Sequence, residues 1–153
     1  QRNLILNPKV FDNMFAGYFE KLFAQAHRYG ARTMMHSCGS VYKLIPRLID
    51  LGLDILDVVQ VDAMDMDIRK LHNEYKGRIV FCGSMSVQST LPFGSTEDVR
   101  WEVRLRQKLF DSGGMIIGPT HRIQAGTPIE NILAMYDEIG SLSRQNEIHQ
   151  GGK

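Results

Sequence analysis

Apolar side chains recur at three- and four-residue steps from Val10 to Ala26, a spacing that predicts an amphipathic helix ending near Tyr29. Asn7 and Pro8 are typical of the cap and first residue of that helix. Short continuous apolar runs predict four buried strands, at 33–36, 55–59, 79–82 and 115–117. Further helices are predicted at 41–51, 66–75, 96–110 and 128–142.

Helices and strands therefore alternate along the whole chain, which favours an α/β fold with a parallel sheet covered by helices. No Gly-x-Gly-x-x-Gly motif follows a strand, and this weakens the case for a dinucleotide-binding fold. Four successive βα units make up half of a (β/α)8 barrel, so we predict a half-barrel domain over residues 1–142. Residues 143–153 are polar and are predicted to form a disordered tail.

Composition narrows the possible functions. The 153 residues carry a net charge of +1, so no broad basic surface argues for nucleic acid or anionic lipid as a partner. No apolar run approaches the roughly 20 residues of a membrane span. The only cysteines are Cys38 and Cys82, which favours a reducing, cytoplasmic location. The chain begins at Gln1, and we expect it to be a piece of a longer protein.

His36 and Cys38 stand two residues apart at the end of the first predicted strand. An imidazole and a thiol at this spacing suit zinc. A third ligand could come from His121, which follows the fourth strand, or from Cys82, which ends the third. The alternatives are a buried packing thiol, a histidine bonded to the backbone, and an ordinary loop histidine. The residues alone leave these possibilities open.

Polar side chains near other strand ends are weaker candidates. Gln60 and Gln88 have amides suited to binding a polar substrate. The acidic segment 62–67 is predicted to be solvated and to cap a helix rather than to bind a metal. The mixed charges of 100–106 predict a solvated helix face with Trp101 partly covered.

Four segments in order resemble the uroporphyrinogen decarboxylase superfamily. They are Met35-His36-Ser37-Cys38-Gly39-Ser40, Phe81-Cys82-Gly83-Ser84-Met85-Ser86-Val87-Gln88, Leu91-Pro92-Phe93-Gly94-Ser95-Thr96-Glu97-Asp98-Val99, and Gly118-Pro119-Thr120-His121-Arg122-Ile123-Gln124 with Thr127-Pro128-Ile129-Glu130-Asn131-Ile132. The resemblance covers about 7–142 and implies the C-terminal half of a single (β/α)8 barrel more than twice as long. The N-terminal half, which in the decarboxylases carries tetrapyrrole-binding residues, has no counterpart here.

The superfamily contains porphyrinogen decarboxylases without a cofactor and zinc methyltransferases that move methyl groups between corrinoid proteins and thiols. In the methyltransferases, a His-x-Cys pair and a distant cysteine hold zinc. His36 and Cys38 match that pair, whereas His121 stands at the third position, where the decarboxylases place a histidine near the substrate. The resemblance therefore implies zinc held by His36, Cys38 and His121, with Cys38 and His121 catalytic.

Three functional hypotheses follow. The first is methyl transfer from a methylcorrinoid, bound to a corrinoid protein, to a small-molecule thiol at a zinc site. The second is decarboxylation of uroporphyrinogen in porphyrin biosynthesis, with no metal and with His121 contacting a carboxylate. The third is an inactive half-barrel, since these residues alone are expected not to support turnover. Its exposed outer strands predict self-association of two half-barrels.

Overall fold

The computed structural model describes residues 2–150, with side chains described as far as Ser141. The helices, including one π-helical turn (η1) and one 3-10 turn (η2), are α1 (Pro8–Phe11), η1 (Asp12–Ala16), α2 (Gly17–Arg28), η2 (Tyr42–Leu44), α3 (Ile45–Asp50), α4 (Ile68–Tyr75), α5 (Thr90–Phe93), α6 (Thr96–Leu109) and α7 (Ile129–Gln150). The strands are β1 (Met34–His36), β2 (Ile55–Val59), β3 (Val80–Met85) and β4 (Met115–Pro119). Within residues 2–150, no helix is long and apolar enough to cross a membrane.

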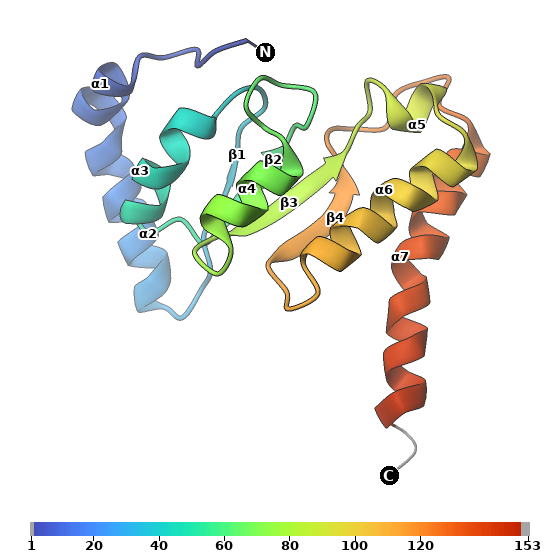
Figure 1. Cartoon of the computed structure of the whole chain (residues 1–153). Coiled ribbons are helices and arrows are strands. Elements are labelled where there is room, and N and C mark those ends of the chain that lie inside the picture. The colour runs from blue at the N-terminus through green and yellow to red at the C-terminus, as the bar shows by residue number, and fades with distance from the viewer. Residues whose placement is uncertain (1, 151–153) are drawn as a thin grey trace.

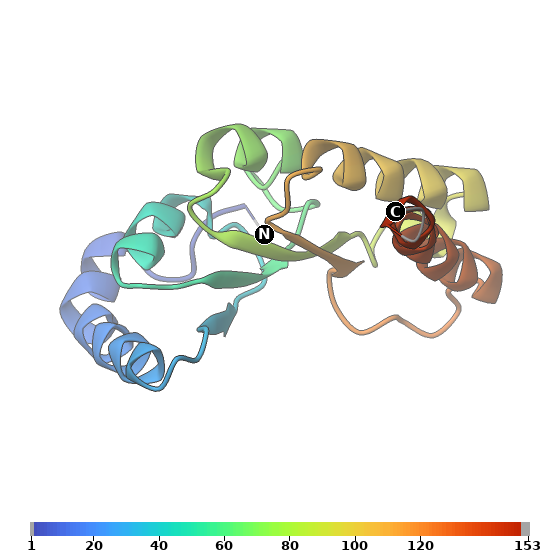
Figure 2. The same ribbon diagram turned by 90° about the horizontal axis from the view of Figure 1, so that it is seen from below.

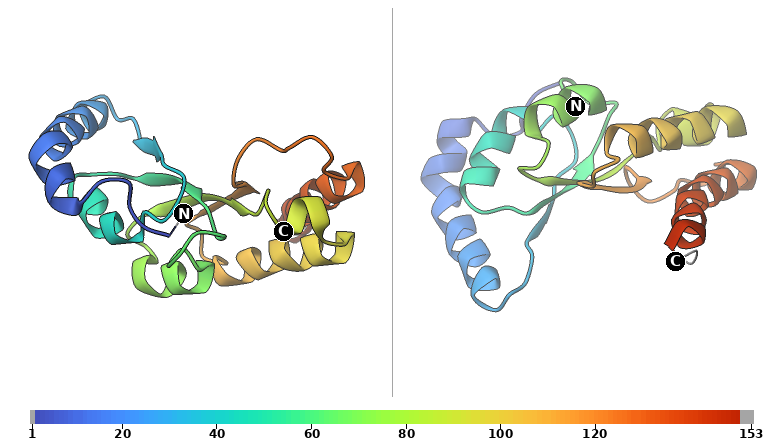
Figure 3. Two further views of the ribbon diagram at one scale, coloured as in Figure 1. Left: turned by 90° about the horizontal axis from the view of Figure 1, so that it is seen from above. Right: turned by 60° about the horizontal axis from the view of Figure 1, so that its bottom comes forward.

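The four strands form one parallel sheet in the order β1-β2-β3-β4. Figure 1 shows the strands alternating with helices along the chain. In Figure 2, α4 and α6 lie along one face of the sheet, while α2 stands beyond β1 and α7 beyond β4. The same arrangement is visible from above in Figure 3. The predicted parallel α/β fold is confirmed, and it corresponds to part of a (β/α)8 barrel.

Most predicted elements are present, but several boundaries differ. The first helix is interrupted by η1, and the segment predicted as a helix at 41–51 begins with η2. Pro46 lies in the first turn of α3, where its missing N–H costs no hydrogen bond, so the α-helix begins there. The short α5 was not predicted.

The predicted end of the last helix near Leu142 is also wrong, because α7 continues to Gln150. No proline or glycine interrupts 143–150, so the sequence contains no strong signal to stop the helix. Residues 151–153, the end of the predicted tail, lie outside the described residues. A domain boundary at 142 stays a prediction.

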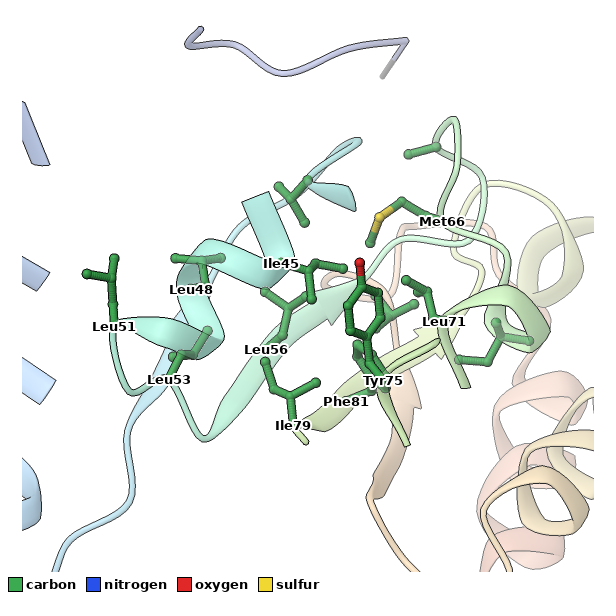
Figure 4. Close-up of a cluster of buried hydrophobic side chains, with 14 of the residues drawn as sticks. Ile45, Leu48, Leu51, Leu53, Leu56, Met66, Leu71, Tyr75, Ile79 and Phe81 are labelled. Carbon is green, nitrogen blue, oxygen red and sulfur yellow. The ribbon is translucent and has the colours of Figure 1, made fainter. Parts of the chain in front are cut away.

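The larger hydrophobic core lies between the sheet and its neighbouring helices. Apolar side chains from β2, β3, α3 and α4 meet there (Figure 4). The fully buried members include Ile45, Leu48, Leu56, Leu71 and Phe81. A smaller cluster joins α5, α6 and α7 to the end of β3. This larger core fixes β1 and β2, the strands that position the candidate site.

The C-terminal half of β3 has an unusual backbone, and this corrects one prediction. Gly83 and Ser84 both have positive φ, and a Cβ at Gly83 would stand 2.2 Å from Val58 Cγ2. The turned backbone presents the Ser84 hydroxyl and carbonyl to Arg106, which donates to both at 3.0 Å. Arg106 is therefore buried against Ser84 and Glu102 instead of lying on a solvated helix face. Burial lowers its pKa to about 10.

Candidate metal and substrate site

His36, Asp57 and Cys82 form a row across three neighbouring strands. The register pairs His36 with Asp57 between β1 and β2, and Asp57 with Cys82 between β2 and β3. In a parallel sheet, residues paired in this way point to the same face. His36 is the last residue of β1, whereas Asp57 and Cys82 are the third residues of β2 and β3. The row therefore reaches the C-terminal edge of the sheet, where (β/α)8 barrels carry their chemistry, only at His36.

The His36 imidazole is held from one side and directed toward a sulfur on the other. Its Nδ1 lies 2.6 Å from Asp57 Oδ2, and its Nε2 lies 3.3 Å from Cys38 Sγ. The His36 side chain is 54% exposed and that of Asp57 27%, so the pair is accessible to solvent. The carboxylate favours a proton on Nδ1, which leaves Nε2 with its lone pair directed at the thiol side.

Gln60 fixes the loop that carries Cys38. Its side chain is 5% exposed, and its Oε1 accepts a 2.7 Å hydrogen bond from the backbone N–H of Gly39. Gly39 has φ +86°, a conformation that L side chains rarely adopt. Gln60, which was predicted to bind substrate, therefore uses its side-chain carbonyl oxygen to hold the backbone next to Cys38.

His121 lies in the exposed loop after β4 and borders a cavity together with His36. The cavity, of about 380 Å³, is also lined by Asp57, Thr120 and Arg122. Thr120 anchors the start of the loop to β3, because its N–H donates to Met85 O at 2.8 Å. The structure thus brings His121 to the same cavity as His36.

The structure does not bring three metal ligands to one point. Between residues 2 and 150, no group of three His, Cys, Asp or Glu side chains is close enough together to bind one ion. His36 and Cys38 form a close pair, while His121 stands apart from it. Completing the predicted set of ligands requires a shift of the exposed loop toward the pair.

Cys82 is partly buried and lies beside Asp57. Burial and the neighbouring Asp57 carboxylate raise the pKa of this thiol to about 11. At neutral pH the sulfur stays protonated, which makes it a poor metal ligand and a poor nucleophile in this arrangement. Cys38, by contrast, is exposed.

Gln88 occupies a different place. It lines a separate cavity with Phe93, Trp101 and Glu102, beside α5 and α6, and not the cavity of His36 and His121. The loop containing it is fixed by Ser86, whose hydroxyl donates to Asp62 at 2.7 Å. Its predicted role in substrate binding would require a substrate that reaches this outer cavity.

The acidic segment behaves as predicted. Asp67 caps α4 by accepting from Lys70 N, and Asp65 forms an ion pair with the Lys70 ammonium. Asp62 instead accepts hydrogen bonds from Ser86 and Ser89. These carboxylates stabilise loops and a helix terminus.

Sequence reasoning missed Asp57. A signal was present, because Asp57 is the single charged residue in the apolar run Ile55–Val59. A carboxylate inside a buried strand needs a partner, since burying an unpaired charge is costly. That partner is His36, and the pairing of β1 with β2 brings the two together.

Comparisons with known proteins agree with the fold. The family model described as uroporphyrinogen decarboxylase (URO-D) matches residues 2–142. No curated protein matches the sequence. A solved methyltransferase from Methanosarcina mazei superposes with a TM-score of 0.70 at 20% sequence identity, covering 90% of this chain. The match spans 38% of that longer protein.

Proposed function

Because the chain belongs to the uroporphyrinogen decarboxylase family, we propose that it forms part of a zinc-dependent methyltransferase barrel. The methyl group would pass from a methylcorrinoid to a thiol sulfur, and the thiol would release its proton. His36 and Cys38 would hold the zinc, and His121 would be the third ligand. A corrinoid protein in the cytoplasm would deliver the methyl donor.

The observation that supports this proposal best is the placement of the His36 ring between Asp57 and Cys38. Zinc in proteins is held by imidazole nitrogen and thiolate sulfur, and the second ring nitrogen of a zinc-binding histidine usually donates to a carboxylate. The donor pair and its carboxylate partner therefore fit zinc. The fold shared with a methyltransferase points the same way without identifying a reaction.

The residues of the chain would each have a definite task. Asp57 would hold the His36 ring so that Nε2 stays available, and Gln60 would keep the Cys38 loop in place through Gly39. Zinc, when bound, lowers the pKa of a coordinated thiol, so that the thiolate forms near neutral pH. The cavity beside His36 and His121 would receive the thiol substrate.

Zinc content tests this proposal. We expect about one zinc per chain in the wild-type protein after incubation with zinc and gel filtration, measured by mass spectrometry of the metal. Cys38→Ser should lose the zinc, and His121→Ala should bind it more weakly. Cys82→Ser is the matched control and should retain it. A wild-type protein without zinc, or a Cys38→Ser variant that binds it normally, would refute the proposal.

A second candidate is uroporphyrinogen decarboxylation. His121 and Arg122 line the cavity together, and such hydrogen-bond donors suit the carboxylate groups of a porphyrinogen. Incubation with uroporphyrinogen and chromatography for coproporphyrinogen distinguishes this activity from methyl transfer. Since the match spans only 38% of the solved methyltransferase, we expect no turnover of either kind from these residues alone.

A further inference from the structure

Arg106 on α6 has an unusual environment for a charged side chain. Among the residues whose side chains the structure describes, it is the only charged one that is buried, at 2% exposure. Its Nε donates to Ser84 Oγ and its Nη2 to Ser84 O, both at 3.0 Å, while its Nη1 pairs with Glu102. A buried guanidinium is costly unless its donors are bonded. Two of these donors hold a single residue of β3.

Ser84 has a backbone conformation that a residue with a side chain rarely adopts. Its φ is +78°, in the left-handed region, and it is fully buried. A residue in such a conformation persists only when the surrounding structure over-determines it. Water does not reach the Ser84 hydroxyl and carbonyl, so Arg106 is the group that holds them from the neighbouring helix.

The backbone that follows Ser84 fixes the loop that carries His121. Met85 accepts a 2.8 Å hydrogen bond from the Thr120 N–H, and the Val87 N–H donates to Thr120 Oγ1 at 3.2 Å. Thr120 is 2% exposed and comes directly after β4. The end of β3 therefore sets the point from which the chain leaves β4, and His121 is the next residue.

We propose that Arg106 is a positioning residue for His121. It does not line the cavity of His36 and His121, and it acts through Ser84 and Thr120. A loop that starts from a different point has to shift further to bring His121 to His36. The placement of His121 does not depend on a metal, whereas the effect on zinc binding rests on the proposed function.

Arg106→Met tests this proposal, because it removes the donors to Ser84. The Glu102 side chain is 25% exposed and can be solvated when the guanidinium is removed, so we expect the variant to fold, which circular dichroism verifies. The NMR resonance of the His121 ring, assigned by its loss in His121→Ala, should move from its wild-type position. The Thr120 amide should exchange faster with solvent.

Arg104→Met is the matched control on the same helix. Arg104 also forms ion pairs, but it bonds to Glu97 and Glu138 instead of Ser84. This variant should leave the His121 resonance and the exchange of the Thr120 amide unchanged.

Ser84→Gly provides a rescue that a general loss of stability would not show. Glycine adopts positive φ without steric strain, so it needs no arginine to hold it in this conformation. In the double variant Ser84→Gly/Arg106→Met, the His121 resonance should therefore return toward its wild-type position.

Zinc affinity provides a further measurement, by competition with a chromogenic chelator. Arg106→Met should bind zinc about tenfold more weakly than the wild type, as expected when the support of a ligand is lost. The double variant should recover most of that loss. A wild-type protein without zinc would refute the proposed function, and the His121 resonance would still decide the role of Arg106.

Three results would refute the proposal for Arg106. They are a folded Arg106→Met variant with the wild-type His121 resonance, an equal displacement of that resonance in Arg104→Met, and a double variant in which it stays displaced. If Arg106→Met does not fold, Arg106→Lys replaces it, because an ammonium keeps the charge beside Glu102 but lacks the planar fork of donors. The same three results then apply.

Discussion

Two histidine–aspartate pairs lie along β2, one just before its first residue and one at its middle, and they differ in how fully the carboxylate is bonded. Before the strand begins, Asp54 accepts from His27 Nε2 at 2.7 Å, from Arg32 at 3.0 Å, and from the Thr33 N–H at 2.7 Å and hydroxyl at 3.0 Å. At the middle of β2, Asp57 holds one nitrogen of His36, the last residue of β1, and the other nitrogen is directed at Cys38.

The Asp54–His27 pair serves stability, whereas the Asp57–His36 pair is available for chemistry. The hydrogen bonds to Asp54 outweigh its desolvation and hold its pKa far below the usual range, which ties α2 to the start of the sheet. The second pair leaves a ring nitrogen of His36 directed at the exposed sulfur of Cys38. In (β/α)8 barrels, the N-terminal face of the sheet serves stability and the C-terminal face carries catalysis. The four predictions below test that division of roles.

The largest effect is expected at Asp54, whose carboxylate accepts several hydrogen bonds. Asp54→Asn replaces a charged acceptor of several hydrogen bonds and should lower the free energy of unfolding by about 2–3 kcal/mol. Urea unfolding followed by circular dichroism measures the change. Asp111→Asn, an exposed aspartate after α6, is the control and should change stability by less than about 0.5 kcal/mol. An equal effect of the two substitutions would contradict the role assigned to Asp54.

At the Asp57–His36 pair, we expect a large effect on zinc binding and a small effect on stability. Asp57→Asn should weaken zinc binding about 10–100-fold, because the carboxylate orients the ligand ring. Stability should change by less than about 1 kcal/mol, since the His36 side chain is more than half exposed. Competition with a chromogenic chelator measures zinc affinity. Asp54→Asn, studied under conditions in which it is folded, should bind zinc like the wild type.

The pH dependence of stability should reveal the role of Asp54 as well. The folded-state pKa of Asp54 is depressed, so its contribution is present above the unfolded value of about 3.9 and is lost as pH falls toward the folded value. Between pH 5 and 2.5, wild-type stability should therefore fall by about 1–2 kcal/mol more than that of Asp54→Asn. Asp98 and Glu138 also have lowered pKa values and contribute to both proteins alike. Parallel pH profiles would rule out this linkage.

The smallest effect is expected at His27. Its side chain is 39% exposed, and Asp54 keeps its other donors when the imidazole is removed. His27→Gln should therefore cost only about 0.5–1 kcal/mol in urea unfolding. A loss as large as that of Asp54→Asn would mean that the histidine dominates this cluster.

Local patterns predicted much of the fold. Asn7 caps the first helix by accepting from Lys9 N, as its sequence position indicated. Ser95 forms a capping box with Asp98 at the start of α6. The strands begin within one residue of the predicted positions. Errors occurred where distant contacts decide the outcome. Arg106 has the sequence context of an exposed helix residue, yet its burial depends on the backbone of Ser84.

The candidate site shows the same limit. His36 and Cys38 could be identified because their proximity is set by two residues of chain. Gln60 was recognised as polar and near a strand end, but its bond to Gly39 depends on how the loops after β1 and β2 meet. Gln60 and Gln88 were both predicted to bind substrate, and the structure places them at separate cavities. Side-chain direction in a loop cannot be obtained from periodicity.

The sequence by itself determined the order of helices and strands, the helix caps and the His-x-Cys pair, because each is decided by residues a few positions apart. Tertiary structure alone decided that Asp57 supports His36, that the Asp54 carboxylate accepts several hydrogen bonds, and that Arg106 is buried. Those contacts join residues 21 or more positions apart, and strand register and helix packing bring them together.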